Sequence, residues 1–113
     1  MVSSGLRGSF PLTAQGIDAN VTQKSPGAYA LGHTTDTTFH ITYVGRSDSD
    51  VAKRLHDHIG KYRRFKYGYF GSPMAAFDKE CRLYHDFDPP DNKYHPARPD
   101  GSGWECPICT IFD

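Results

Sequence analysis

The spacing of apolar and polar residues predicts strands in the first half of the chain. In residues 39–44, Phe39, Ile41 and Tyr43 face one side and the intervening residues the other, which is the two-residue period of a strand. Residues 27–31 form a second short apolar stretch. The polar, turn-rich segment between them predicts an antiparallel hairpin with a loop longer than the tightest turns. The aromatic residues 65–70 predict a third strand.

Two helices are predicted beyond the hairpin. The first follows the Ser and Asp residues at 47–50, any of which can cap a helix, and its apolar positions Val51, Leu55 and Ile59 recur near helical spacing. The second begins at Ser72-Pro73, a good cap and first-turn pair, and runs to about residue 87, where two prolines end it.

The remaining segments carry weaker patterns. Residues 1–26 are rich in Ser, Gly, Thr and Pro and predict a poorly ordered or irregular N-terminal arm. Residues 27–92 are the predicted core, and residues 93–113 a loop-rich extension with one short strand at 110–112. A chain of 113 residues suits one domain. We therefore predict a small α/β (α+β) domain in which helices flank a central antiparallel sheet of three strands.

Charge is unevenly distributed along the chain. The formal net charge is zero, which weighs mildly against a general polyanion binder, since such domains usually run basic. Residues 43–66, however, hold seven basic and three acidic residues, whereas residues 78–113 hold four basic and eight acidic ones. Because phosphate binding depends on the local field, the basic segment keeps nucleic acid as a candidate partner.

Composition also suggests a compartment. No apolar run approaches the ~18 residues that a membrane helix needs, and no leader peptide is recognisable. Three cysteines make a poor disulfide framework and fit a reducing environment. We expect a soluble protein with no membrane partner, located in the cytoplasm, or in the nucleus of a eukaryote.

Polar residues on the two helices suggest a site. Arg54 and His58 are four residues apart, so they share one face of the first predicted helix. Glu80 falls in the apolar stripe of the second helix, where a carboxylate is costly unless it is paired or bound to a metal. An ion pair with Arg54 or Lys53 is the structural alternative for Glu80.

These residues and two short triplets together resemble a known family. The triplets are Gly27-Ala28-Tyr29 and Tyr43-Val44-Gly45, and they are followed in order by Arg54, Glu80 and Asn92. This order resembles the GIY-YIG nucleases over residues 27–92, and His58 is similar to a histidine that several members carry. The chain departs from the family in its spacing, since Tyr43 follows Tyr29 by fourteen positions, a few more than usual, and in Ala28, where isoleucine is typical.

The resemblance implies a divalent-metal-dependent endonuclease, a hydrolase of phosphodiester bonds, with DNA favoured over RNA. Glu80 would hold one Mg or Mn ion, and Arg54 would neutralise the phosphate. Tyr43 is the candidate general base, with Tyr29 assisting and His58 as a rival base. Asn92 would orient the metal or brace the fold. A domain without appended modules is expected to form a homodimer or to draw its specificity from a partner protein.

Basic residues near the first helix are candidate substrate contacts. They interleave with aromatic residues, which suits phosphate contact with base stacking, or equally a core strand with solvated cations. They are Arg46, Lys61, Arg63, Arg64 and Lys66.

Cys106 and Cys109 have the spacing of half a zinc site, which Cys81, His85 or His95 would have to complete. We favour two ordinary thiols in a loop over zinc. Two alternatives to the nuclease stay open: a non-catalytic nucleic-acid-binding module of the same fold, and a zinc-stabilised interaction domain.

Overall fold

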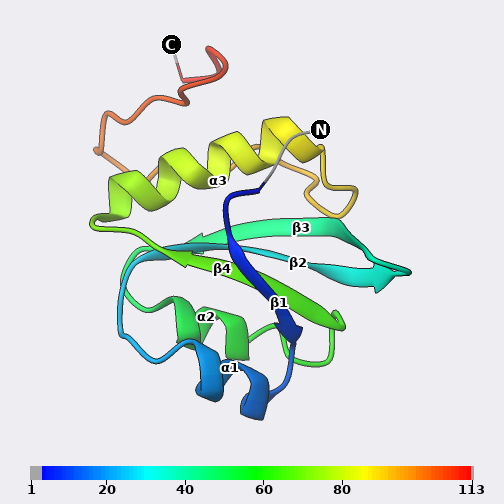
Figure 1. The fold of residues 1–113 in the computed structure, drawn as a ribbon. Helices are drawn as coiled ribbons and strands as arrows, with labels where there is room; N and C mark the ends of the chain where they lie inside the picture. The colour runs from blue at the N-terminus through cyan, green and yellow to red at the C-terminus, as the bar shows by residue number, and fades with distance from the viewer. Residues whose placement is uncertain (1–3, 113) are drawn as a thin grey trace.

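One antiparallel sheet lies between two layers of helix and gives the protein an α+β fold (Figure 1). The computed structural model describes residues 4–112. The strand order is β1-β4-β2-β3, with β1 at Arg7–Pro11, β2 at Gly27–Thr35, β3 at Thr38–Ser47 and β4 at Arg64–Tyr69. The helices are α1 at Ala14–Asn20, α2 at Val51–His56 and α3 at Pro73–Phe87. None of the described helices is long and apolar enough to cross a membrane.

The sheet has four strands, so the prediction of three is wrong. The additional strand, β1, comes from the segment predicted to be irregular, and it pairs with β4 in the register Arg7↔Tyr67. The same segment contains α1, which is capped by the Thr13 side chain and buries Ile17. β1 has no buried residue, and α1 has only Ile17. Neither element therefore produces a sustained apolar period in the sequence.

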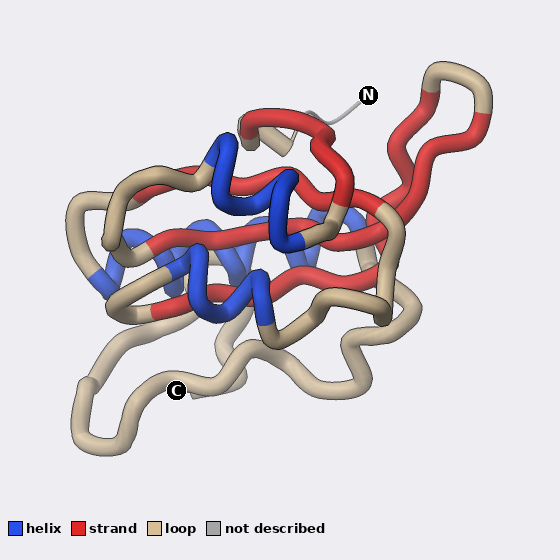
Figure 2. The backbone as a smooth tube through the Cα atoms, turned by 90° about the horizontal axis from the view of Figure 1, so that it is seen from below, coloured by secondary structure: helices blue, strands red, loops and turns tan. Residues whose placement is uncertain are grey.

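The β2–β3 hairpin is longer and its turn tighter than predicted. Both strands continue through the segment expected to form a loop, and only Asp36 and Thr37 separate them. Asp36 adopts a positive φ of 54°, a conformation that Asp tolerates better than most residues and that a tight hairpin turn requires. The hairpin tip extends beyond the helices (Figure 2).

The predicted helices are present, but α2 is shorter than expected. The Asp50 side chain caps it, and it ends at His56, so His58 lies in the turn beyond the helix. Gly60, at a φ of 89°, follows in that turn. The cap of α3 is as predicted, because the Ser72 hydroxyl accepts a hydrogen bond from the Ala75 N–H and Pro73 opens the helix.

Each face of the sheet has its own core. The face beneath α1 and α2 buries aromatic and branched side chains, among them Tyr29, Leu31 and Phe65. The face beneath α3 carries the small residues Ala28 and Ala30 with Val44, which pack against Leu83 of the helix. After α3, residues 88–112 contain neither helix nor strand, so the short strand predicted at 110–112 is absent.

Candidate active site

The two triplets lie side by side on β2 and β3. Tyr29 is directly opposite Gly45 in the antiparallel register. A Cβ atom on Gly45 would overlap the Tyr29 hydroxyl, and a Cβ on Gly27 would come within 2.5 Å of the Gly68 carbonyl oxygen on β4 and 2.9 Å of the Val51 Cβ on α2. The glycine of each triplet is therefore required by packing, one to leave room for the Tyr29 hydroxyl and the other to let β4 and α2 approach β2.

A cavity of about 350 Å³ lies beside β3, at the edge of the sheet. Because β3 is an edge strand, side chains from α2 and from α3 on the opposite face both reach this cavity. Its lining comprises Tyr29, Tyr43, Gly45, Arg46, Asp48, Arg54, His58, Glu80 and Ala97. All five residues predicted to be catalytic are among them. Asp48 and Ala97 were not predicted, since Asp48 resembles a helix-cap residue and Ala97 carries no chemical signal.

His58 joins the two tyrosines. Its Nε2 atom lies 3.0 Å from the Tyr29 hydroxyl oxygen, and its ring centroid is 5.4 Å from that of Tyr43. Its Nδ1 atom is buried and has no hydrogen-bond partner among the described residues, so Tyr29 is the group that selects its tautomer. Burial, with the charges of Lys61 and Arg54, lowers the pKa of His58 and favours the neutral imidazole.

Both tyrosines hold their protons more tightly than ordinary tyrosines. Burial raises the pKa of Tyr29, and the neighbouring Tyr43 adds to this. Burial and the charge of Glu80 raise the pKa of Tyr43. Arg54 lowers both values, but less than burial raises them. Positive charge from Arg54 thus acts on both hydroxyls without outweighing desolvation.

Arg54 supplies positive charge that is available to a ligand. It is exposed on α2, lines the cavity and forms no ion pair within residues 4–112. A guanidinium with unused donors beside a cavity is well suited to a phosphate oxygen.

Glu80 is buried, with 8% of its surface exposed, and it is paired with Arg46. An Arg46 guanidinium nitrogen donates to Glu80 Oε1 over 2.7 Å, and Arg46 Nε donates to Asp48 over 2.9 Å. The sequence suggested Arg54 or Lys53 as the ion-pair partner of Glu80, but the partner is Arg46. Burial raises the pKa of Glu80, and Arg46 only partly offsets this.

Asn92 braces the edge strand. Its side-chain oxygen accepts from the Val44 N–H over 2.8 Å, and its amide donates to the Val44 carbonyl over 3.0 Å. Asp91 N–H adds a bond to the Thr42 carbonyl. These bonds satisfy backbone groups on the open side of β3. Of the two roles predicted for Asn92, orienting the metal or bracing the fold, the bonds correspond to bracing.

The predicted substrate contacts are scattered. Arg46 is held in the cavity, Lys61 and Arg63 are exposed in the turn after α2, and Arg64 bonds Ser9. Lys66 lies over the Phe39 ring.

The aromatic residues interleaved with these cations belong mainly to the fold. Phe65 and Tyr67 are buried in the core beneath α1 and α2, which leaves them unavailable for base stacking. Tyr62 is half-buried, and its hydroxyl donates to Asp91.

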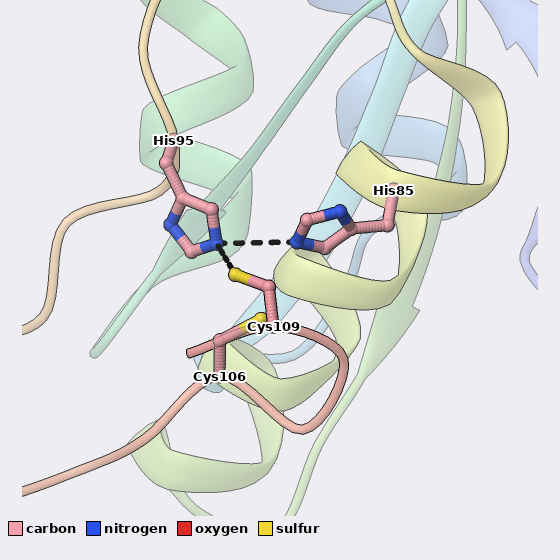
Figure 3. A group of neighbouring side chains, drawn as sticks. All are labelled: His85, His95, Cys106 and Cys109. Carbon is pink, nitrogen blue, oxygen red and sulfur yellow. Dashed lines mark hydrogen bonds between the residues drawn. The ribbon is translucent and has the colours of Figure 1, made fainter. Parts of the chain in front are cut away.

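A second cluster lies beside the C-terminal end of α3, where the C-terminal extension returns to the helix (Figure 3). His85, His95, Cys106 and Cys109 each direct one donor atom to a common point, and these atoms lie within 4.8 Å of one another. Such a group can hold a metal, and its nitrogen and sulfur donors suit zinc better than magnesium. The loop of ordinary thiols that we favoured therefore gains two histidine neighbours. Cys81 stays outside the cluster, and burial raises the pKa of its thiol.

Comparison with protein-family models, with curated proteins and with solved structures found no match to this chain.

Proposed function

We propose that the protein is a metal-dependent endonuclease that hydrolyses phosphodiester bonds. One observation carries the proposal: Tyr29, Tyr43, Arg54, His58 and Glu80, which come from β2, β3, α2, the turn after it and α3, line a single cavity. Phosphodiester hydrolysis needs a proton acceptor, positive charge at the phosphate and assistance to the leaving oxygen. The cavity contains a candidate for each of these tasks, and their order along the chain resembles that of the GIY-YIG nucleases.

Glu80 is the proposed ligand for one Mg or Mn ion. Its carboxylate offers the hard oxygen donors that these ions prefer, and it lines the cavity while Arg46 occupies only Oε1. One carboxylate suffices for such an ion, because magnesium commonly keeps several waters and takes further oxygens from substrate phosphates. When bound, the ion would polarise the phosphate and stabilise the departing oxygen.

The protein's own residues account for the other tasks. Arg54 neutralises charge on the phosphate, since its donors have no competing carboxylate among the described residues. His58 accepts the proton of the attacking water through the Tyr29 hydroxyl, 3.0 Å away, because a neutral imidazole is a better acceptor at neutral pH than either protonated tyrosine. Tyr43 orients the water and is the second candidate base.

DNA is the proposed target, by the same resemblance. The zero net charge of the chain leaves little long-range attraction for a polyanion, so a homodimer or a partner protein is proposed to supply affinity and specificity.

One observation favours a second candidate, a module that binds nucleic acid without cutting it. The Arg46–Glu80 pair already neutralises the carboxylate that a catalytic metal needs. In this alternative the pair is permanent, and Arg54 binds phosphate alone.

The two candidates differ in a cleavage assay. Plasmid DNA, single-stranded DNA and RNA are incubated with Mg or Mn, and separately with EDTA, using the wild type, Glu80→Ala and the control Asp78→Asn, which alters another carboxylate of α3. The nuclease proposal expects metal-dependent cutting by the wild type and the control and at least about a 100-fold loss in Glu80→Ala. Equal cutting by all three proteins would exclude the mechanism, and binding without cutting would favour the module.

A further inference from the structure

The C-terminal extension brings together four residues that are distant in sequence. His85 lies in the last turns of α3, His95 follows the helix by eight positions, and Cys106 and Cys109 lie near the end of the described chain. Figure 3 shows the two imidazoles and the two sulfurs pointing toward one another. Nothing in the nuclease mechanism uses these side chains.

Two of the distances between donor atoms match a tetrahedral ion. Bond lengths of about 2.0–2.1 Å to nitrogen and about 2.3 Å to sulfur place two nitrogens about 3.3 Å apart, and a nitrogen and a sulfur about 3.6 Å apart, around zinc. The His85 and His95 Nε2 atoms are 3.3 Å apart, and the Cys109 Sγ is 3.4 Å from the same His95 Nε2. The four donor atoms all lie within 4.8 Å of one another, so movements of about 1 Å would complete the tetrahedral site.

The hydrogen bonds around the cluster direct lone pairs inward. His95 Nδ1 donates to the Pro96 carbonyl over 2.8 Å, which leaves Nε2 as a lone pair facing His85 and Cys109. One lone pair cannot serve both neighbours well, whereas a cation can be shared among all of them. The Ile108 N–H also donates to Cys106 Sγ over 3.4 Å, an arrangement that supports a thiolate ligand.

We propose that His85, His95, Cys106 and Cys109 bind one structural zinc ion. Four protein ligands leave no open coordination position, which is typical of structural and not catalytic zinc. Thiolate and imidazole ligands also discriminate against Mg and Mn, so this site is distinct from the one proposed at Glu80.

The ion would hold the extension against α3. Residues 88–112 lack secondary structure, and their apolar contacts with α3 consist of a small cluster around Phe77, Cys81 and Trp104. His95 also belongs to residues 91–97, which line a second cavity together with Tyr43 and Glu80. Zinc would therefore fix the extension and one wall of this second cavity, which shares Tyr43, Glu80 and Ala97 with the candidate active site.

Metal content tests this proposal independently of cleavage. The untagged full-length protein is purified under reducing conditions, supplied with zinc, desalted and measured by elemental mass spectrometry. The ligand variants Cys109→Ser and His85→Ala are compared with two control variants that remove histidines outside the cluster, His33→Ala on the exposed hairpin and His56→Ala at the end of α2. We expect one zinc per chain in the wild type and both controls, and less than a tenth of that in the ligand variants.

Cobalt substitution supplies a readout that needs no variant. Cobalt in the wild-type site should show thiolate charge-transfer bands and the intense visible bands of tetrahedral coordination. Chelation should lower the thermal midpoint of the wild type and leave that of Cys109→Ser unchanged. Absence of both zinc and the cobalt signal in the wild type, zinc retained by both ligand variants, or zinc lost in either control variant would overturn the proposal. An inactive protein that binds zinc in this way would contradict only the nuclease proposal.

Discussion

At the scale of single residues, close contacts explain why glycine occupies its place in each triplet. Gly45 is opposite Tyr29 across the β2–β3 pair, and the space that a side chain would need is filled by the tyrosine ring. The hydroxyl of that ring in turn reaches His58. A change of one methyl group at Gly45 would therefore be transmitted to the proposed proton acceptor.

We predict that Gly45→Ala displaces Tyr29 and destabilises the fold. Overpacking of this kind costs about 1–3 kcal/mol, so the thermal midpoint should fall by several degrees. Gly71→Ala is the matched control, because a Cβ at Gly71 meets no atom within 4 Å. Urea unfolding of both variants measures the difference, and equal stabilities would show that the contact between Gly45 and Tyr29 is not tight.

His58 should contribute to the pH dependence of stability. Its pKa is lowered in the folded state, so the unfolded chain takes up the proton first as the pH falls below about 6.5. The contribution is complete above that pH and is lost on acidification. The ordinary pKa of histidine, about 6.5, lies between pH 7.5 and pH 5. Over this range the free energy of unfolding should therefore fall more steeply for the wild type than for His58→Asn. Parallel curves would mean that His58 titrates alike in both states.

At the scale of elements, β3 is an edge strand whose open side is covered by the segment that follows α3. Asn92 mimics a neighbouring strand by bonding both backbone groups of Val44. Since Tyr43 and Gly45 flank Val44, this brace also fixes the strand that supplies half of the tyrosine pair.

We predict that Asn92→Ala loosens β3. It leaves the Val44 N–H and carbonyl without their partners, at a cost of about 1–3 kcal/mol. Asn92→Asp keeps the acceptor for the N–H and loses the donor, so its stability should lie between those of the wild type and Asn92→Ala. Hydrogen exchange at the Val44 amide reports the change directly. Equal exchange in all three proteins would show that the strand does not depend on Asn92.

The elements differ in how far the sequence predicts them. The start of α3 was predictable because Ser72 and Pro73 act locally at a helix N-terminus. The outer half of the β2–β3 hairpin was not, because residues 33–35 are all exposed and show no alternation. β1 and α1 were missed because each contains a single large apolar residue, Phe10 and Ile17, which cannot establish a period.

At the scale of the whole molecule, the candidate site joins the two layers of helix around the edge of the sheet. The residue types of the site could be predicted from their order in the sequence. The Arg46–Glu80 pair could not, because its members are 34 positions apart and meet only once α3 has packed on the sheet. The two histidines of the second cluster depend in the same way on the path of the extension.

The central claim, that this edge cavity is catalytic, is tested most directly through Arg54. The measurement is the single-turnover rate of plasmid nicking in Mn for the wild type, Arg54→Ala and Lys53→Ala, the last removing a neighbouring exposed cation of α2 that lies outside the cavity. Loss of a preorganised positive charge at the phosphate should slow Arg54→Ala by about 10²–10³-fold. Lys53→Ala should stay within a few-fold of the wild type. Equal rates for Arg54→Ala and Lys53→Ala, or no metal-dependent nicking by the wild type, would contradict the account.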